Sequence, residues 1–321
     1  MASMPIIALV GPTATGKTAL SVALAKQLGA VIVSADSRCV YQGLDIGTAK
    51  PTLVEREGVV HYGMDVALPT ECFTVAQYQA LATQTLQALQ QANTPVIVVG
   101  GTGFYLQAAL QCPHQVPAVP PNPAIRARLQ AECELQGLPA LYARLHQLDP
   151  RRASQLYPQD AFRILRALEI IEITGKPVPE APTQPEQMQH QSPYSVHWLG
   201  LCWNNRERHR QVIANRVVQQ VKDGWIEEVE HLVATHGSGA HALQVTHGYP
   251  EWVTYLQQVA VQTTAAKEFR QAVMTDITQQ VQQYARRQHT WFQRNTAIQW
   301  FSVEDTHEQQ RLQWALQACG L

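Results

Sequence analysis

The 321-residue sequence lacks the paired cysteines, the long apolar run and the net charge that would indicate several classes of protein. Its six cysteines form no C-x-x-C pair, so we expect reduced thiols. No apolar run reaches the roughly 18 residues of a membrane span, and the first residues do not resemble a signal peptide. The net charge of −1 excludes a uniformly basic polyanion-binding protein. We therefore expect a cytoplasmic protein that does not bind membranes.

The basic residues are concentrated in the middle of the chain. Residues 119–216 hold 12 Lys and Arg against 9 Asp and Glu, whereas residues 1–118 hold 5 against 6 and residues 217–321 hold 7 against 10. Eighteen of the 24 basic residues are Arg, whose planar guanidinium binds phosphates and stacks on bases. Only the middle third is net positive, although ordinary solvated surface also accounts for most single Arg residues.

A phosphate-binding motif follows directly on the apolar run 6–10. Residues 11–18 read Gly-Pro-Thr-Ala-Thr-Gly-Lys-Thr, which fits G-x-x-x-x-G-K-[ST]. In such a loop the backbone N–H groups point at an anion, and the helix that follows adds the positive end of its dipole. Lys17 supplies a full charge, and the Thr18 hydroxyl is placed to hold Mg²⁺. The residues predicted to bind the anion are Gly11, Thr13, Ala14, Thr15, Gly16, Lys17 and Thr18. A Gly-rich turn without a ligand is the alternative.

The order of apolar runs predicts an α/β fold with a doubly wound parallel sheet, like that of P-loop NTPases. Nearly continuous apolar runs are typical of strands covered on both faces, and helical patterns separate them. The first two predicted helices cover 18–28, which ends before Gly29, and 75–91, which follows Thr74 as N-cap. The five predicted strands cover residues 6–10, 31–34, 96–99, 196–201 and 298–303.

About 95 residues separate the third and fourth predicted strands, more than one crossover needs. We predict a helical insertion at 119–193, with residues 1–118 and 194–321 as the catalytic core. Asn122 is placed as N-cap of a helix over 124–136, and a second helix over 160–174 ends at Gly175. A long helical stretch is expected over 204–296.

Two further loops follow predicted strands, at the edge of a parallel sheet where ligands bind. Asp36 comes after the second strand and is expected to face the anion loop, where a carboxylate can take a proton or hold Mg²⁺ through water. Capping of a helix is the alternative role for this side chain. Thr102 follows Gly100 and Gly101 after the third strand, and a plain tight turn would also account for these glycines.

Two Arg-containing segments are candidates for phosphate or RNA contacts. Arg163 and Arg166 share a face of the predicted 160–174 helix, either as a clamp on a leaving group or as solvated surface. Residues 284–294 interleave aromatic residues with Arg, a pattern that suits RNA. For Trp291 and Phe292 a position in the core is the favoured interpretation.

With these motifs, the chain resembles the bacterial tRNA dimethylallyltransferases over nearly its whole length. The matching blocks are GPTATGKT at 11–18, DSRCVYQGLDIGTAKP at 36–51, HYGMDV at 61–66, GGTGFY at 100–105, QDAFRILRALE at 159–169, the pair at 248–249, and RRQHTWF at 286–292. Two positions depart from the family pattern: the family usually has Gln where this chain has Cys39, and a basic residue where this chain has Pro250.

The resemblance implies a reaction and roles for residues. The family transfers a dimethylallyl group from dimethylallyl diphosphate to N6 of the adenosine 3′ of the anticodon, in tRNAs that read codons starting with U. It implies Asp36 as general base, Thr18 as Mg²⁺ ligand, and Lys17 with Arg166 on the diphosphate. The implied tRNA contacts are Asp36, Ser37, Arg38, Cys39, Thr102, Arg126, Gln159, Asp160, Ala161, Phe162, Arg163, Gly248 and Tyr249.

Three other functions are weighed against this one. A P-loop small-molecule kinase would bind ATP and transfer phosphate, but no nucleotide-kinase lid signature accompanies Asp36. An adenylate isopentenyltransferase would modify free AMP, ADP or ATP, and the insertion would be surplus to that task. A non-catalytic RNA-binding regulator would need neither Asp36 nor Thr18. We expect a monomer that binds tRNA and dimethylallyl diphosphate, with Mg²⁺ as cofactor.

Overall fold

A computed structural model describes residues 5–111, 119–179, 192–259 and 266–321. The chain forms two compact units, one of residues 1–114 and 184–321 and the other of residues 115–183. Both boundaries fall in stretches outside the described residues, so the exact edges of the insertion stay a prediction. No helix in the described ranges is long and apolar enough to cross a membrane.

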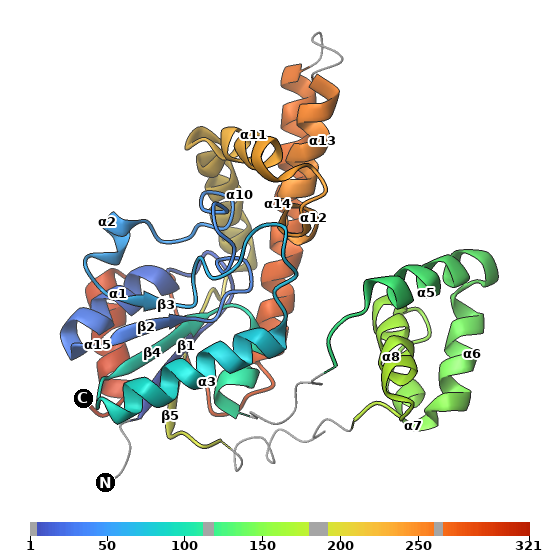
Figure 1. Ribbon diagram of the computed structural model, residues 1–321. Helices are drawn as coiled ribbons and strands as arrows, with labels where there is room; N and C mark the ends of the chain where they lie inside the picture. Colours follow the sequence, from blue (N-terminus) through green and yellow to red (C-terminus); the bar gives the residue numbers. More distant parts are fainter. Residues whose placement is uncertain (1–4, 112–118, 180–191, 260–265) are drawn as a thin grey trace. The chain divides into compact units, whose positions relative to one another are not determined.

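The first unit is built on a six-stranded parallel sheet with the order β3-β2-β4-β1-β5-β6, which confirms the predicted fold class (Figure 1). Five of its strands are those that the sequence predicts. The sixth, β3, has two residues and is too short to show a periodicity. The strands are β1 (Ile6–Val10), β2 (Val31–Ser34), β3 (His61–Tyr62), β4 (Val96–Gly100), β5 (Val196–Cys202) and β6 (Gln299–Ser302).

Every residue of β1 is buried, because helices cover both faces of the sheet. Ile6, Ala8 and Val10 pack into one apolar cluster, and Ile7 and Leu9 pack into another on the opposite face. Helices α1 (Lys17–Leu28) and α15 (Glu308–Ala318) contribute to the second cluster, and α3 (Val75–Gln91) to the first. The predicted N-cap of α3 is confirmed, since the Thr74 side chain accepts from the backbone N–H of Gln77.

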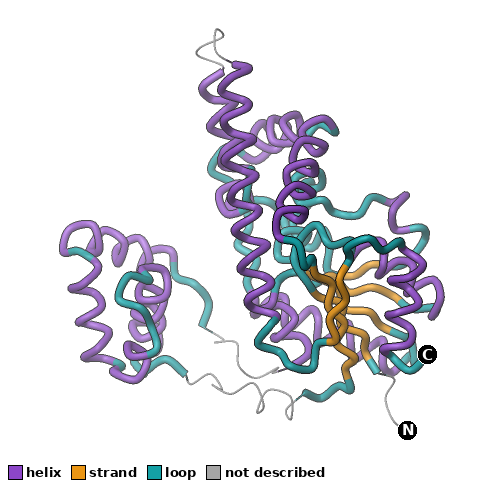
Figure 2. The backbone as a smooth tube through the Cα atoms, turned by 180° about the vertical axis from the view of Figure 1, so that it is seen from behind, coloured by secondary structure: helices purple, strands orange, loops and turns teal. Residues whose placement is uncertain are grey.

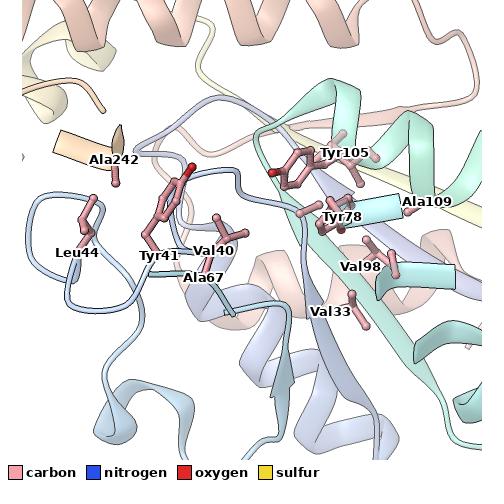
Figure 3. Packing of buried hydrophobic residues seen from close by; sticks show 14 of the residues in the cluster. Val33, Val40, Tyr41, Leu44, Ala67, Tyr78, Val98, Tyr105, Ala109 and Ala242 are labelled. Atoms are coloured by element: carbon pink, nitrogen blue, oxygen red, sulfur yellow. The ribbon is translucent and has the colours of Figure 1, made fainter. Parts of the chain in front are cut away.

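An aromatic pair fixes the end of β2 against the helices (Figure 3). The rings of Tyr78 on α3 and Tyr105 on α4 (Gly103–Leu106) stack with centroids 3.8 Å apart. The Tyr78 hydroxyl donates to the carbonyl of Ser34 at 3.0 Å. This contact holds the last residue of β2, two positions before Asp36.

The predicted helical stretch after β5 is resolved into several helices. Both views show α13 and α14 side by side (Figures 1 and 2). The core helix α14 runs from there to the sheet, where Phe292 is buried as predicted. These helices are α10 (Arg206–Lys222), α11 (Trp225–His236), α12 (His241–Val245), α13 (Tyr249–Val259) and α14 (Ala266–Phe292). Short elements elsewhere in the unit are α2 (Leu53–Arg56) and η1 (Gln107–Gln111).

The second unit is helical and has its own apolar core. The predicted caps are confirmed: Asn122 accepts from the N–H of Ala124 and Ile125, and Gly175 ends the last helix in a left-handed conformation. Glu169 is buried in this unit and forms ion pairs with Arg126 at 2.8 Å and Arg166 at 2.7 Å. Its helices are α5 (Pro123–Gln136), α6 (Leu138–Leu148), α7 (Pro150–Ser154) and α8 (Ala161–Thr174).

Candidate active site

A cavity of about 240 Å³ lies at the carboxyl ends of the central strands of the first unit. Its lining combines the loop after β1 with residues that follow β2 and β4, as expected for an open parallel sheet. Lys17 and Asp36 both line it, which confirms that the two loops face each other. Helices α10 and α14 supply a further part of the wall through residues such as Arg216 and Tyr284.

The loop after β1 has the backbone of an anion-binding turn. Ala14 and Gly16 adopt left-handed conformations, with φ of 61° and 81°. At Gly11, directly after β1, a Cβ would overlap the carbonyl of Leu201 on the neighbouring strand β5, so only glycine fits there. Among the described residues no side chain caps the start of α1, so its first N–H groups are available to an anion.

One detail of the predicted loop is wrong. The backbone N–H of Thr13 does not point at the anion site, because it donates to Oε1 of Gln288 at 2.9 Å. The loop carbonyls are also held from outside: His209 Nε2 lies 2.9 Å from the carbonyl of Thr13, and Trp203 donates to that of Ala14 at 3.0 Å. These contacts fix the loop from α10, α14 and the segment after β5.

Two half-buried basic side chains lie at this loop. Lys17 Nζ donates to the carbonyl of Pro12 at 2.6 Å, and burial lowers its pKa to about 7, although Asp36 opposes the shift. Arg216 donates from Nη1 to the Thr13 hydroxyl at 3.1 Å. Burial lowers the Arg216 pKa as well, but a guanidinium remains charged at neutral pH. The site therefore concentrates positive charge where an anion is predicted to bind.

We expect the affinity of this site for pyrophosphate to depend on the charge of Lys17. A bound anion favours the ammonium and raises its pKa, so binding above pH 7 takes up a proton and weakens as the pH rises. Isothermal titration with pyrophosphate, without Mg²⁺, at about pH 6 to 9 measures this in the wild type and in Lys17→Met. The ionisation of pyrophosphate is common to both, so the ratio of their affinities isolates Lys17. A ratio independent of pH would contradict the lowered pKa.

In the ligand-free protein the lowered pKa of Lys17 also makes the stability of the fold depend on pH. An unfolded lysine has a pKa of about 10.4, so between this value and pH 7 the unfolded chain binds more protons than the folded chain. The free energy of unfolding should therefore rise with pH across that window in the absence of an anion.

Asp36 is held by the turn that it begins. Its Oδ1 accepts from the backbone N–H of Arg38 at 2.8 Å and from that of Cys39 at 3.4 Å. Residues 37–40 form a turn and no helix begins there, so the alternative role of capping a helix is wrong. The turn occupies a single carboxylate oxygen of Asp36. The neighbouring Ser37 is tied to Thr102, whose hydroxyl accepts from the Ser37 N–H at 3.0 Å. The structure thus brings together Asp36 and Thr102, as the sequence predicts.

Cys39, the departure from the family pattern, is buried and lines the same cavity. Burial raises the pKa of its thiol well above the usual range, and the Asp36 carboxylate adds to the shift. The side chain is therefore a neutral thiol at this position, and not a nucleophile.

The pair 248–249, predicted to contact tRNA, is buried in the structure. Tyr249 is fully buried, and its hydroxyl donates to Glu228 at 2.7 Å. Gly248 is also buried, with φ of 91°, and a Cβ there would overlap the ring of Trp225. The neighbouring Thr246 and His247 line the cavity instead. If the pair contacts RNA, it can do so only through backbone atoms of Gly248 and Tyr249.

The remaining predicted residues lie in the second unit, which is described by itself. Arg166 is held by Glu169 and donates to the carbonyl of Val119 at 2.5 Å. Asp160 caps α8 and lies 3.3 Å from the guanidinium of Arg163. Phe162 is 74% exposed, which is unusual for an aromatic side chain. The predicted roles of this unit in binding tRNA and diphosphate stay predictions. They concern Arg126, Gln159, Asp160, Ala161, Phe162, Arg163 and Arg166.

Sequence reasoning missed Arg216 and Gln288, two side chains that reach Thr13 from the C-terminal half. Gln288 lies inside the RRQHTWF block, where the Arg and aromatic residues drew attention. Arg216 lies on α10, and the sequence around it contains no motif that indicates an anion site. In the described residues no cluster of three or more His, Cys, Asp or Glu could hold a metal ion. A metal would therefore depend on hydroxyl, carboxylate and substrate oxygens.

Comparison with known proteins identifies the family of this chain. The model of the family described as IPP transferase matches residues 39–295. A tRNA dimethylallyltransferase of Gloeobacter violaceus is 40% identical over 311 residues, which are 96% of each chain. One of Acaryochloris marina is 38% identical over 301 residues, which are 94% of this chain and 93% of the relative.

Solved structures show the same likeness. The tRNA isopentenylpyrophosphate transferase of Bacillus halodurans superposes with a TM-score of 0.68 at 32% identity, over 98% of this chain and 96% of that one. A eukaryotic dimethylallyltransferase described as acting on tRNA shares the fold, with a TM-score of 0.72 at 22% identity over 94% of this chain and 74% of that one. The family model and the relatives together confirm the resemblance seen in the motifs: the chain belongs to the IPP transferase family.

Proposed function

We propose that this protein transfers a dimethylallyl group from dimethylallyl diphosphate to N6 of the adenosine next to the anticodon of tRNA, with release of diphosphate. The observation that carries the proposal is that one cavity holds both a cationic anion-binding loop, with Lys17 and Arg216, and the carboxylate of Asp36. The family and its named tRNA-modifying relatives support the choice of substrates.

The anion-binding loop suits the departure of diphosphate. The allylic carbon becomes a good electrophile only when the charge that develops on the leaving group is stabilised. The charged side chains of Lys17 and Arg216 and the free N-terminus of α1 are fixed before the reaction, so they need no reorganisation during it. Thr18 would supply the hydroxyl ligand for Mg²⁺ beside the diphosphate oxygens, an oxygen-only donor set that this cation prefers. Bound there, Mg²⁺ would neutralise charge on the leaving group.

Asp36 suits the other half of the reaction. An exocyclic amine of adenine is a weak nucleophile, because its lone pair is delocalised into the ring. Oδ1 of Asp36 is engaged by the turn, which fixes the carboxylate, and Oδ2 remains to accept the proton that the amine loses. The N6–carbon bond forms as the carbon–oxygen bond to diphosphate breaks, and the proton goes to Asp36.

The second unit is proposed to bind the anticodon arm. The target base must leave the stack of the anticodon loop to reach an enclosed cavity. Unpaired bases of such a loop are bound by stacking on aromatic side chains and by Arg. Tyr157 and Phe162 are 80% and 74% exposed on this unit, and Arg163 lies beside Phe162 in the sequence.

A transfer assay tests the proposal. The protein is incubated with Mg²⁺, labelled dimethylallyl diphosphate and unmodified tRNA that reads a codon starting with U, and in parallel with free AMP. We expect label in the tRNA and none in AMP, because the cavity accepts a base delivered by an anticodon arm. The matched control is the same tRNA with guanosine in place of the target adenosine, which should remain unlabelled. Label in AMP would identify an adenylate isopentenyltransferase. Absence of any transfer would refute the proposal and leave a kinase or an RNA-binding protein.

A further inference from the structure

Gln288 connects two loops that are far apart in the sequence. It lies on α14 and is 5% exposed. Its Oε1 accepts from the backbone N–H of Thr13 at 2.9 Å, and its Nε2 donates to the carbonyl of Gly101 at 3.0 Å. A Cβ at Gly101 would overlap the Gln288 amide, so the glycine makes room for this bond. Both ends of one buried amide are thus used on the loops after β1 and β4.

The second of these loops is in turn fixed to the residues around Asp36. The backbone N–H of Thr102 donates to the carbonyl of Ala35 at 3.2 Å, and the Thr102 hydroxyl accepts from the N–H of Ser37 at 3.0 Å. Ala35 and Ser37 flank Asp36 in the sequence. A continuous series of hydrogen bonds therefore links the anion-binding loop, through Gln288 and the 101–102 backbone, to both neighbours of Asp36.

We infer that Gln288 is a positioning residue that sets the distance between the anion-binding loop and the Asp36 carboxylate. This inference rests on the proposed function, in which the first loop binds the leaving group and Asp36 takes the proton. The amine, the allylic carbon and the departing oxygen must be aligned, and a misplacement of about 1 Å costs up to about 10²-fold in rate. Both ends of the Gln288 amide are engaged by the backbone of the two loops, so its loss should act on kcat more than on the binding of either substrate.

The first test is the substitution Gln288→Met, which keeps the length of the side chain and removes both hydrogen bonds. We expect kcat to fall by about 10- to 100-fold, while KM for dimethylallyl diphosphate and for tRNA changes less than about threefold. Gln283→Met is the matched control, because Gln283 lies on the same helix and is exposed. Unchanged kcat in Gln288→Met, or a loss confined to KM for one substrate, would overturn the inference.

The second test separates positioning from a contribution to stability alone. In Gln288→Glu a protonated carboxyl offers one donor and one acceptor, the same pattern as the amide. When ionised it offers only acceptors and opposes the carbonyl of Gly101. The ratio of kcat in Gln288→Glu to kcat in the wild type should therefore rise as the pH falls, with the fold checked by circular dichroism at each pH. A ratio independent of pH would overturn the inference, and this test decides if Gln288→Met does not fold.

The wild-type reaction is measured first in both tests. If the wild type transfers no prenyl group to tRNA, the proposed function fails and the inference fails with it. If the wild type is active and both Gln288 variants match it, only the inference fails.

Discussion

Asp36→Asn should lower the turnover of prenyl transfer by about 10²- to 10⁴-fold, the usual contribution of a general base. Asparagine keeps an oxygen that can accept from the N–H groups of Arg38 and Cys39, so the turn after β2 should persist. It cannot take the proton that the amine loses. The measurement is single-turnover transfer to tRNA with saturating dimethylallyl diphosphate, which reports the chemical step.

Pyrophosphate binding provides the internal control for this variant. Because Asp36 is not among the groups proposed to hold the diphosphate, the affinity for pyrophosphate should be preserved or slightly increased by the loss of a negative charge near Lys17. Asp36→Ala removes the turn acceptor as well and should be less stable than Asp36→Asn. Near-normal turnover in Asp36→Asn would show that another group accepts the proton.

Arg216→Met should lower kcat/KM for dimethylallyl diphosphate by about 10²- to 10³-fold, similar to the loss of one preorganised donor to a developing anion. The guanidinium is half-buried and donates to the Thr13 hydroxyl at 3.1 Å, in a place where a charge is screened less than on the open surface. Methionine fills similar space and carries neither the charge nor the hydrogen bond. Steady-state kinetics with saturating tRNA measure the effect.

Arg210→Met is the matched control, since Arg210 lies on the same helix with its side chain 62% exposed. It should leave kcat/KM for the prenyl donor unchanged, because exposed charges are largely screened by salt. If Arg216→Met leaves kcat/KM as unchanged as Arg210→Met does, Arg216 does not stabilise the leaving group.

Most of the first unit follows from local patterns in the sequence. The apolar runs that become β1 and β2 have the predicted bounds, because strands buried on both faces require uninterrupted apolar residues. The N-caps at Thr74 in the first unit and Asn122 in the second are correct, because a helix start favours a side-chain oxygen at one defined position. β3 was missed because two residues carry no periodic signal.

The candidate site was predicted less completely than the fold. Lys17 and Asp36 were found because each lies in the segment that follows a strand, and parallel strands end at the same edge of a sheet. Tyr249 was assigned to tRNA although its side chain is buried against the protein interior. A match in a motif does not distinguish a residue that touches substrate from one that supports the wall behind it.

What the sequence determined by itself is the anion-binding loop, the carboxylate after β2 and the alternation of strands and helices, because each is encoded within a dozen neighbouring residues. What only the tertiary structure decided is how that loop is completed. Arg216 and Gln288 reach Thr13 across 203 and 275 residues of chain. Contacts at such separations depend on how α10 and α14 pack on the sheet, and packing is specified by the whole core and not by a local pattern.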